Sequence, residues 1–178
     1  MTKQLHEQRQ FAGESKERVR HLNVALIAFI LLAIVDAIIG GTVSARLQVA
    51  GWTTRDQQFN NAYQLIYGII VAGMLGWLYF HTRAAKPVLV ILILYLGYVE
   101  DTLFYLFIPL VNPLISVLAN GTSYRVPTGA LFPERISGWV GWVGRMVWGQ
   151  NVSFEISQVF LINILAIAAV LPLMRKSN

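Results

Sequence analysis

Four apolar segments, each long enough to cross a lipid bilayer as a helix, constrain the fold of this chain more than any other feature. A helix rises 1.5 Å per residue, so about 20 apolar residues cross the roughly 30 Å hydrocarbon core. The four segments span about 22–41, 62–80, 87–108 and 154–174. The third begins at Pro87, a residue suited to a first helical position, and Pro109 and Pro113 interrupt it. The sequence therefore predicts an all-α fold, an integral membrane bundle of four transmembrane helices.

Composition supports a membrane protein over a soluble one. Hydrophobic residues make up 56% of the 178 residues and charged residues 13%, whereas soluble domains average about 25% charged residues. The chain has no cysteine, which excludes disulfides, thiolate catalysis and zinc sites built on cysteine. We predict a single transmembrane domain over 22–178. It is preceded by a charged segment over 1–21, which is either a surface helix or a partly ordered tail.

A tryptophan-rich stretch lies between the third and fourth segments. Ile136–Gly149 holds Trp139, Trp142 and Trp148 with a single arginine, Arg145, and is too short to span a bilayer. Tryptophan favours the boundary between lipid and water. We expect this stretch to be either an interfacial segment lying on the membrane surface or a re-entrant segment that dips into it.

The distribution of basic residues predicts the orientation of the chain. With the N-terminus inside, nine of the 14 lysines and arginines fall in the inner segments, and five are spread over the longer outer loops. Lysine and arginine are more frequent in cytoplasmic loops than in outer ones. We therefore expect a multi-pass protein whose N-terminus and C-terminus are both cytoplasmic.

Polar residues gather at one depth of the predicted bundle. Glu100 and Asp101 lie about 20 Å along the third helix, and Asp36 lies at nearly the same depth in the first. An acid at the centre of a membrane helix costs about 2.5–3.5 kcal/mol, so we expect these groups to share a polar layer in the outer half of the bundle. Candidate members of this ligand or ion-pair layer are Asp36, Gln64, Tyr98, Glu100, Asp101, Tyr105, Arg145 and Glu155.

Helical spacing refines the expected geometry of the layer. Tyr98, Asp101 and Tyr105 share one face of a continuous helix, so two phenols can flank and hydrogen-bond one carboxylate. We therefore expect Asp101 to matter more than Glu100. Small residues on the first helix (Ala33, Ala37 and Gly41) and on the second (Gly68, Ala72 and Gly76) favour close approach of neighbouring helices.

Three roles are open for the acids: a structural ion pair or hydrogen-bonded network, a site for a ligand, proton or cation, and catalysis. None of the four segments contains a lysine or arginine, so a cationic partner must come from an outer loop, with Arg145 first and Arg46 second. His21 and His81 are expected at the inner ends of their helices, far from the acids, and no histidine-based metal site is predicted. No cofactor is indicated.

Two functions remain from different classes. In the first, the chain is an accessory or structural subunit of a larger membrane complex, which contacts other subunits, or its own copies, through small-residue helix faces. In the second, it is a stand-alone membrane protein that binds or acts on a small ligand, a lipid headgroup or a cation at the polar layer. No nucleophile or metal motif indicates an enzyme, and no basic patch indicates nucleic acid.

Overall fold

The computed structural model describes residues 2–50, 54–126, 130–150 and 152–174, which form six helices and one pair of short strands. The helices are α1 (Thr2–Ala50), α2 (Thr54–Thr82), α3 (Ala85–Leu96), α4 (Val99–Leu118), α5 (Gly138–Trp148) and α6 (Ile156–Met174). Strand β1 (Arg135–Ile136) pairs antiparallel with β2 (Phe154–Glu155), with Arg135 opposite Glu155.

Four helical stretches are long and apolar enough to cross a membrane, judged by length and composition. They are Val19–Leu47, Ala62–Thr82, Val99–Leu118 and Ile156–Met174. The predictions of a mostly helical chain and of four helices of spanning length are therefore confirmed. The N-terminal segment is helical from Thr2 and continuous with the first spanning stretch, which is one of the two alternatives considered for it.

The prediction of one helix over 87–108 is wrong. The chain forms two helices, α3 and α4, which are separated at Gly97 and Tyr98. Pro109 and Pro113 do not end α4, which continues to Leu118. Tyr98 adopts φ 61° and ψ 12°, a left-handed conformation that is uncommon outside glycine, and this turn redirects the chain.

Tertiary contacts explain why the helix breaks at this position. Gly97 lies against α6 so closely that an added Cβ would be 2.2 Å from the Cβ of Ala166. The indole N–H of Trp139 donates to the Leu96 carbonyl (3.3 Å), which satisfies one acceptor at the end of α3. The Tyr98 hydroxyl donates to the Ser137 carbonyl (3.2 Å). The segment that leads into α5 therefore holds the break.

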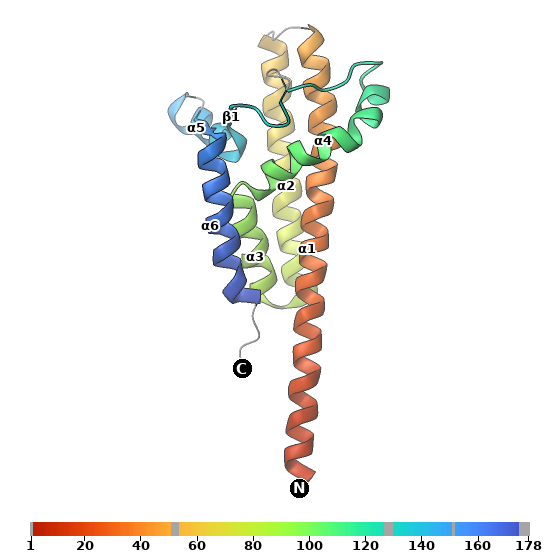
Figure 1. Cartoon of the computed structure of the whole chain (residues 1–178), viewed down its shortest axis with the longest axis vertical. Helices are drawn as coiled ribbons and strands as arrows, with labels where there is room; N and C mark the ends of the chain where they lie inside the picture. The colour runs from red at the N-terminus through yellow and green to blue at the C-terminus, as the bar shows by residue number, and fades with distance from the viewer. Residues whose placement is uncertain (1, 51–53, 127–129, 151, 175–178) are drawn as a thin grey trace.

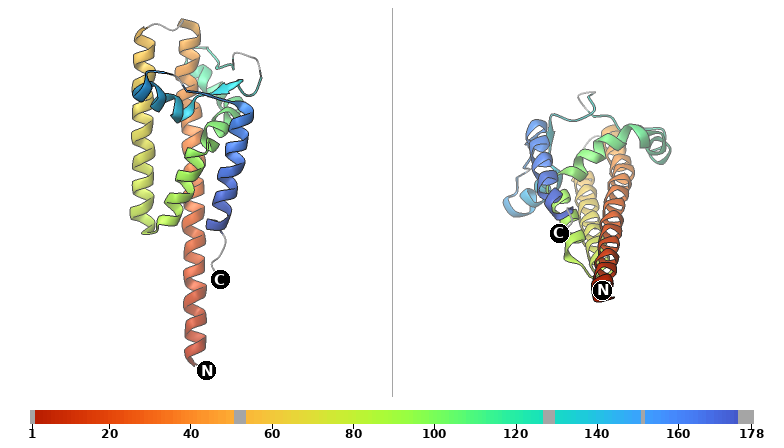
Figure 2. Two further views of the ribbon diagram at one scale, coloured as in Figure 1. Left: turned by 90° about the vertical axis from the view of Figure 1, so that its left-hand side faces the viewer. Right: turned by 60° about the horizontal axis from the view of Figure 1, so that its bottom comes forward.

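The helices form an elongated bundle in which α1 is the longest element. Its N-terminal part extends beyond the other helices (Figure 1). From the turn that joins α2 to α3, α3 rises along the bundle and α4 continues at a slant (Figures 1 and 2). Helix α5 and the strand pair lie at the opposite end from this turn, which we call the α5 end and the turn end respectively.

Two of the buried clusters join α1 to its neighbours. One joins α1, α2, α3 and α6 and contains Phe29, Leu78 and Ile91. The other joins α1 to α4, where a Cβ added at Gly41 would lie 2.6 Å from Cδ1 of Ile115. The small residues of the first helix thus permit close packing against α4. A Cβ added at Gly68 or Gly76 of α2 would meet no described atom within 4 Å.

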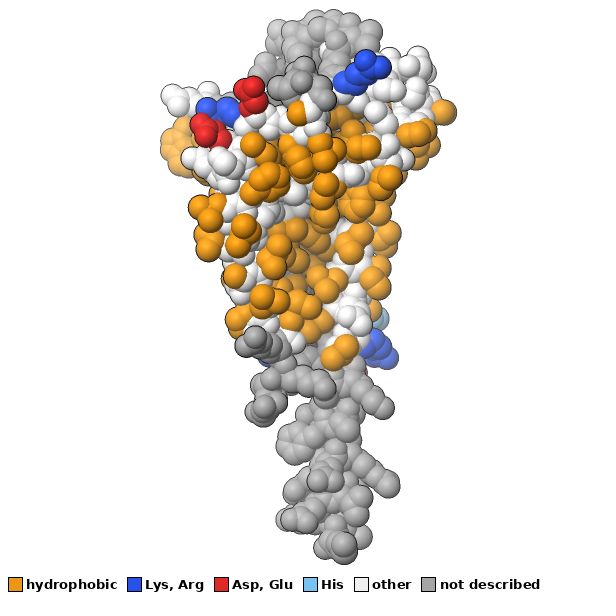
Figure 3. Space-filling view, in the orientation of Figure 1, with side chains coloured by type: hydrophobic (Ala, Val, Ile, Leu, Met, Phe, Trp, Pro, Cys, Tyr) orange, Lys and Arg blue, Asp and Glu red, His pale blue; other side chains and the backbone are white. Residues whose placement is uncertain are grey.

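Exposed apolar side chains cover the middle of the bundle. Figure 3 shows hydrophobic side chains over most of this face, with charged side chains near the two ends. Ile66, Ile69 and Phe80 of α2 are between 57% and 64% exposed, and Leu110 and Val117 of α4 are about three-quarters exposed. This distribution suits a chain whose middle section contacts lipid or other apolar surfaces.

Candidate functional site

A cavity of about 350 Å³ lies at the α5 end, enclosed by α1, α2, α4 and the segment that carries β1 and α5. We call it the polar cavity. Its polar lining consists of Asp36, Ser44, Tyr63, Gln64, Asp101, Tyr105, Tyr124, Arg135, Ser137 and Arg145. Five of the eight residues predicted for the polar layer are among them, namely Asp36, Gln64, Asp101, Tyr105 and Arg145.

Asp36 and Glu100 belong to one hydrogen-bonded network that joins α1, α2 and α4. The Tyr63 hydroxyl donates to Oδ1 of Asp36, and the Tyr67 hydroxyl donates to Oε1 of Glu100 at 2.8 Å. Both hydroxyl donors come from α2, which therefore connects the acids of α1 and α4.

Glu100 is the more enclosed of the two adjacent acids. Its side chain is 3% exposed and is not among the residues that line the polar cavity. Asp101 is half-buried and lines the cavity. Both acids are in the first turn of α4, where the positive end of the helix dipole favours negative charge. The break between α3 and α4 therefore supplies a stabilisation that the interior of a continuous helix would lack.

The expected hydrogen bond from the Tyr98 phenol to Asp101 is wrong. Tyr98 is 1% exposed, but its hydroxyl donates to the Ser137 carbonyl and its ring packs edge-on against Phe154 at a centroid distance of 5.7 Å. The left-handed conformation of Tyr98 removes it from the helical face that carries Asp101. The Tyr98 ring nevertheless stays beside Asp101, since a Cβ added at Gly138 would lie 2.7 Å from both Oδ2 of Asp101 and Cε1 of Tyr98.

Tyr105 and Tyr124 form another wall of the polar cavity, and the ring of Phe104 packs edge-on against both. Asn112 fixes the loop that carries Tyr124, because its amide donates to the Tyr124 carbonyl and accepts from the Tyr124 N–H, both at 3.0 Å. Burial raises the pKa of the Tyr124 phenol, so this side chain is a neutral donor and acceptor at physiological pH.

The arginines of the polar cavity do not neutralise its acids. Within the described part of the chain, no lysine or arginine forms an ion pair with Asp36, Glu100 or Asp101. Nε of Arg145 is buried and has no hydrogen-bond partner among the described residues. Arg135 donates instead to Oγ and the carbonyl of Ser153, at 3.0 and 3.1 Å.

Two further predicted residues lie away from the acids. Arg46, the second candidate for a cationic partner, donates to the Leu118 carbonyl at the end of α4. Glu155 lies in β2 rather than in a helix, is exposed, and does not line the polar cavity. The expectation that it starts the fourth helix is wrong, because the pairing of β1 with β2 holds Phe154 and Glu155 extended.

The sequence analysis did not identify the tyrosines of α2, or the residues between α4 and α5, that contact the acids or line the polar cavity. Tyr63 and Tyr67 are four residues apart on α2 and hold the two acids of the network. Residues four apart share one face of a helix, so this spacing beside Gln64 could have indicated that both tyrosines belong to the polar layer. Tyr124 and Arg135 carried no such signal, because only the fold of the loop brings them to the polar cavity.

An apolar groove adjoins the polar cavity. It has a volume of about 250 Å³, lies between α1 and α2, and is lined by Val35, Ile39, Ile66 and Ile70 among others. Asp36, Val43 and Tyr63 line both the groove and the polar cavity. The two spaces therefore share a wall, with charged groups on one side and aliphatic side chains on the other.

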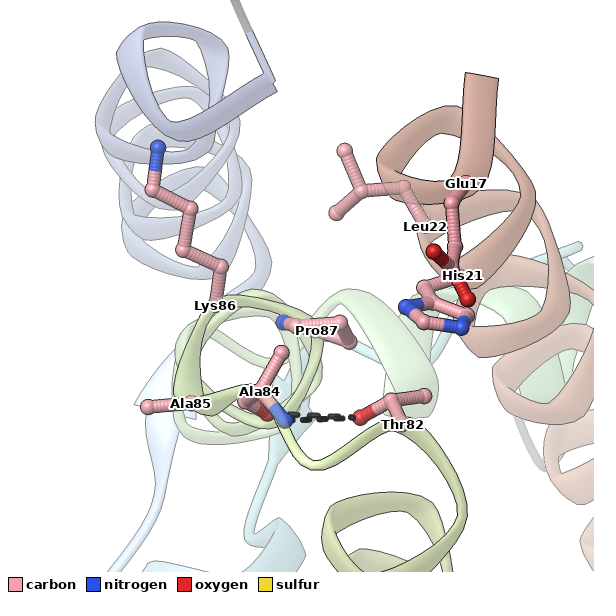
Figure 4. Close-up of a pocket in the computed structure, with 8 residues that line it drawn as sticks. All are labelled: Glu17, His21, Leu22, Thr82, Ala84, Ala85, Lys86 and Pro87. Atoms are coloured by element: carbon pink, nitrogen blue, oxygen red, sulfur yellow. Dashed lines mark hydrogen bonds between the residues drawn. The ribbon is translucent and has the colours of Figure 1, made fainter. Parts of the chain in front are cut away.

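A larger cavity of about 470 Å³ lies at the turn end. Figure 4 shows Glu17 and His21 of α1 facing Pro87 across it, and the hydrogen bond between the Ala84 N–H and the Thr82 hydroxyl that closes the turn. None of the eight residues predicted for the polar layer lines this cavity. The polar cavity is thus the candidate site, because it combines carboxyl groups, phenols and an arginine without a hydrogen-bond partner at Nε.

The described residues contain no group of three or more histidines and acids arranged to hold a metal ion. The polar cavity instead offers carboxylate acceptors, phenol hydroxyls and guanidinium donors, which suit a small organic ligand. No family model, curated protein or solved structure matches this chain.

Proposed function

We propose that this chain is a multi-pass membrane protein that binds, in the polar cavity, a small molecule carrying both an ammonium group and an anionic group. The proposal places both termini on the cytoplasmic side and the polar cavity toward the outer side. The α5 helix would lie at the outer membrane surface, as the tryptophans of its sequence predict.

One observation carries the proposal: acids and an arginine line the same cavity without pairing. Asp36 and Asp101 line the polar cavity from α1 and α4, and Arg145 lines it from α5. An unpaired charge in a confined space is costly, so a ligand with both charges would complement each group at once. The volume of about 350 Å³ is in the range of small-molecule sites.

The aromatic lining supports the cationic part of the ligand. Tyr63, Phe104, Tyr105 and Tyr124 surround the acids, and aromatic faces attract ammonium groups. The guanidinium of Arg145 offers several donors in a plane, a geometry that fits a phosphate or carboxylate. The ligand would thus lie with its ammonium group toward Asp36 and Asp101 and its anionic group toward Arg145.

Phosphoethanolamine, which has one amine and one phosphate and no acyl chain, is a suitable probe. Titrated into the purified protein, it should raise the melting temperature, because a ligand at 100 times its Kd stabilises the folded state by about 2.7 kcal/mol. Asp101→Asn and Arg145→Gln should each remove this response. Glu155→Gln is the matched control, since Glu155 is exposed and outside the polar cavity. An equal response in all four proteins, or none in the wild type, would refute the proposal.

A second candidate, an accessory subunit of a larger complex, is favoured by the surface of α2. A Cβ added at Gly68 or Gly76 would meet no described atom within 4 Å, and membrane helices associate through such small residues. Ala72→Leu, placed between them, should dissociate a complex seen in mild detergent and leave phosphoethanolamine binding intact. If the wild-type chain migrates as a monomer in lipid nanodiscs and still binds the probe, the subunit role is excluded.

A further inference from the structure

We infer that the ligand of the polar cavity is a phospholipid with a zwitterionic headgroup, one of whose acyl chains lies in the apolar groove between α1 and α2. This inference rests on the function proposed above and adds the class of molecule and the path of its chain. It is carried by the wall that the two spaces share, formed by Asp36, Val43 and Tyr63.

The composition of the apolar groove fits a hydrocarbon chain. Val35 and Ile39 of α1 and Ile66 and Ile70 of α2 line it, and each is between 43% and 57% exposed. These residues are one turn apart on their helices, so the groove follows the bundle axis for roughly 12 Å over about eight residues. An acyl chain that runs parallel to the helices matches this direction and this chemistry.

The position of the acids at the shared wall fits the headgroup. Asp36 lines both spaces, with Tyr63 donating to its carboxylate, and Asp101 and Arg145 lie on the side of the polar cavity alone. A lipid whose chain enters from the groove would bring its headgroup past Asp36. Its ammonium group would then meet carboxylates, and its phosphate would meet the guanidinium of Arg145.

The opening of the groove explains how such a ligand would arrive. The exposed edges of Ile39 and Ile66 belong to the apolar middle of the bundle, in helices long enough to cross a membrane. A lipid could therefore move sideways from the bilayer between α1 and α2, with its chain remaining in apolar surroundings. A water-soluble ligand has no need of an apolar groove beside its site.

The test compares binding of phosphoethanolamine and of dihexanoyl phosphatidylethanolamine to the protein held in amphipol. Each methylene removed from water contributes about fourfold in affinity, converted from about 0.8 kcal/mol, so burial of only two methylenes predicts a gain of at least about tenfold for the lipid. Ile66→Trp should fill the groove and bring the affinity for the lipid down to that for phosphoethanolamine.

Two controls make the comparison specific. Leu65→Trp adds the same side chain at a neighbouring position of α2 that is similarly exposed (53%, against 57% for Ile66) but does not line the groove, and it should leave both affinities unchanged. Dihexanoyl phosphatidylglycerol has the same chains and no amine, and it should bind at least tenfold more weakly than the ethanolamine lipid.

The outcomes separate the two proposals. If phosphoethanolamine binds and the lipid binds no more tightly, or if Ile66→Trp has no effect, the acyl-chain inference is wrong and the proposed function stands. Equal binding of the two lipids, or lipid binding that survives Asp101→Asn, overturns recognition of a zwitterionic headgroup. If neither ethanolamine compound binds, both proposals fail.

Discussion

Removing the hydroxyl of Tyr67 should destabilise the bundle measurably, because that hydroxyl holds the most buried acid of the network. The Tyr67 hydroxyl donates to Oε1 of Glu100 at 2.8 Å, and Glu100 is 3% exposed. Tyr67→Phe keeps the ring and leaves a buried acceptor without this donor, which costs about 1–3 kcal/mol. For a chain of this length the loss corresponds to a fall of about 3–9 °C in melting temperature, at about 3 °C per kcal/mol.

The assay is thermal unfolding in one mild detergent, followed by tryptophan fluorescence. Tyr79→Phe is the matched control, since Tyr79 lies on the same helix and is 47% exposed, and its melting temperature should stay within about 1 °C of the wild type. A second comparison measures the interaction between Tyr67 and Glu100 separately from other effects of the substitution. In a Glu100→Leu background the further change Tyr67→Phe should cost much less, because its acceptor has already been removed. Equal melting temperatures for Tyr67→Phe and the wild type would refute the network.

Three further predictions concern the packing of glycines, the orientation of the chain and the depth of α5. Gly97→Ala should lower the melting temperature by several degrees, because the new Cβ would lie 2.2 Å from the Cβ of Ala166. Gly76→Ala has open space around the new Cβ, so it should be neutral or stabilise α2 by about 0.5–1 kcal/mol. A cysteine introduced at Ser123 should react with a membrane-impermeant reagent on intact cells. A cysteine introduced at Ser177, which is outside the described residues, should not react. The reverse pattern would invert the proposed topology. In a variant whose only tryptophan is Trp148, which is 65% exposed, lipid-attached quenchers near the membrane surface should reduce the fluorescence more than deep ones. Stronger quenching by the deep quenchers would place α5 inside the bilayer.

The sequence alone was sufficient for the helical content and the spanning lengths. Apolar runs of about 20 residues leave few alternatives to helices, because the pattern is read over many residues and small local deviations do not alter it. Counting residues at 1.5 Å each also led to the prediction that the acids share one depth of the bundle. In the structure, Asp36 and Asp101 do line one cavity at the α5 end.

Only the tertiary structure decided where the third helix breaks and what the acids contact. Gly97 permits a helix end but does not require one, because glycine also occurs inside membrane helices, and the break depends on contacts with Ala166 of α6 and with Ser137 ahead of α5. The same break directs the Tyr98 hydroxyl to the Ser137 carbonyl and places both acids at the start of α4. Partners such as Tyr67 and Tyr124 come from distant segments, so local periodicity could not assign them, because it describes each helix by itself.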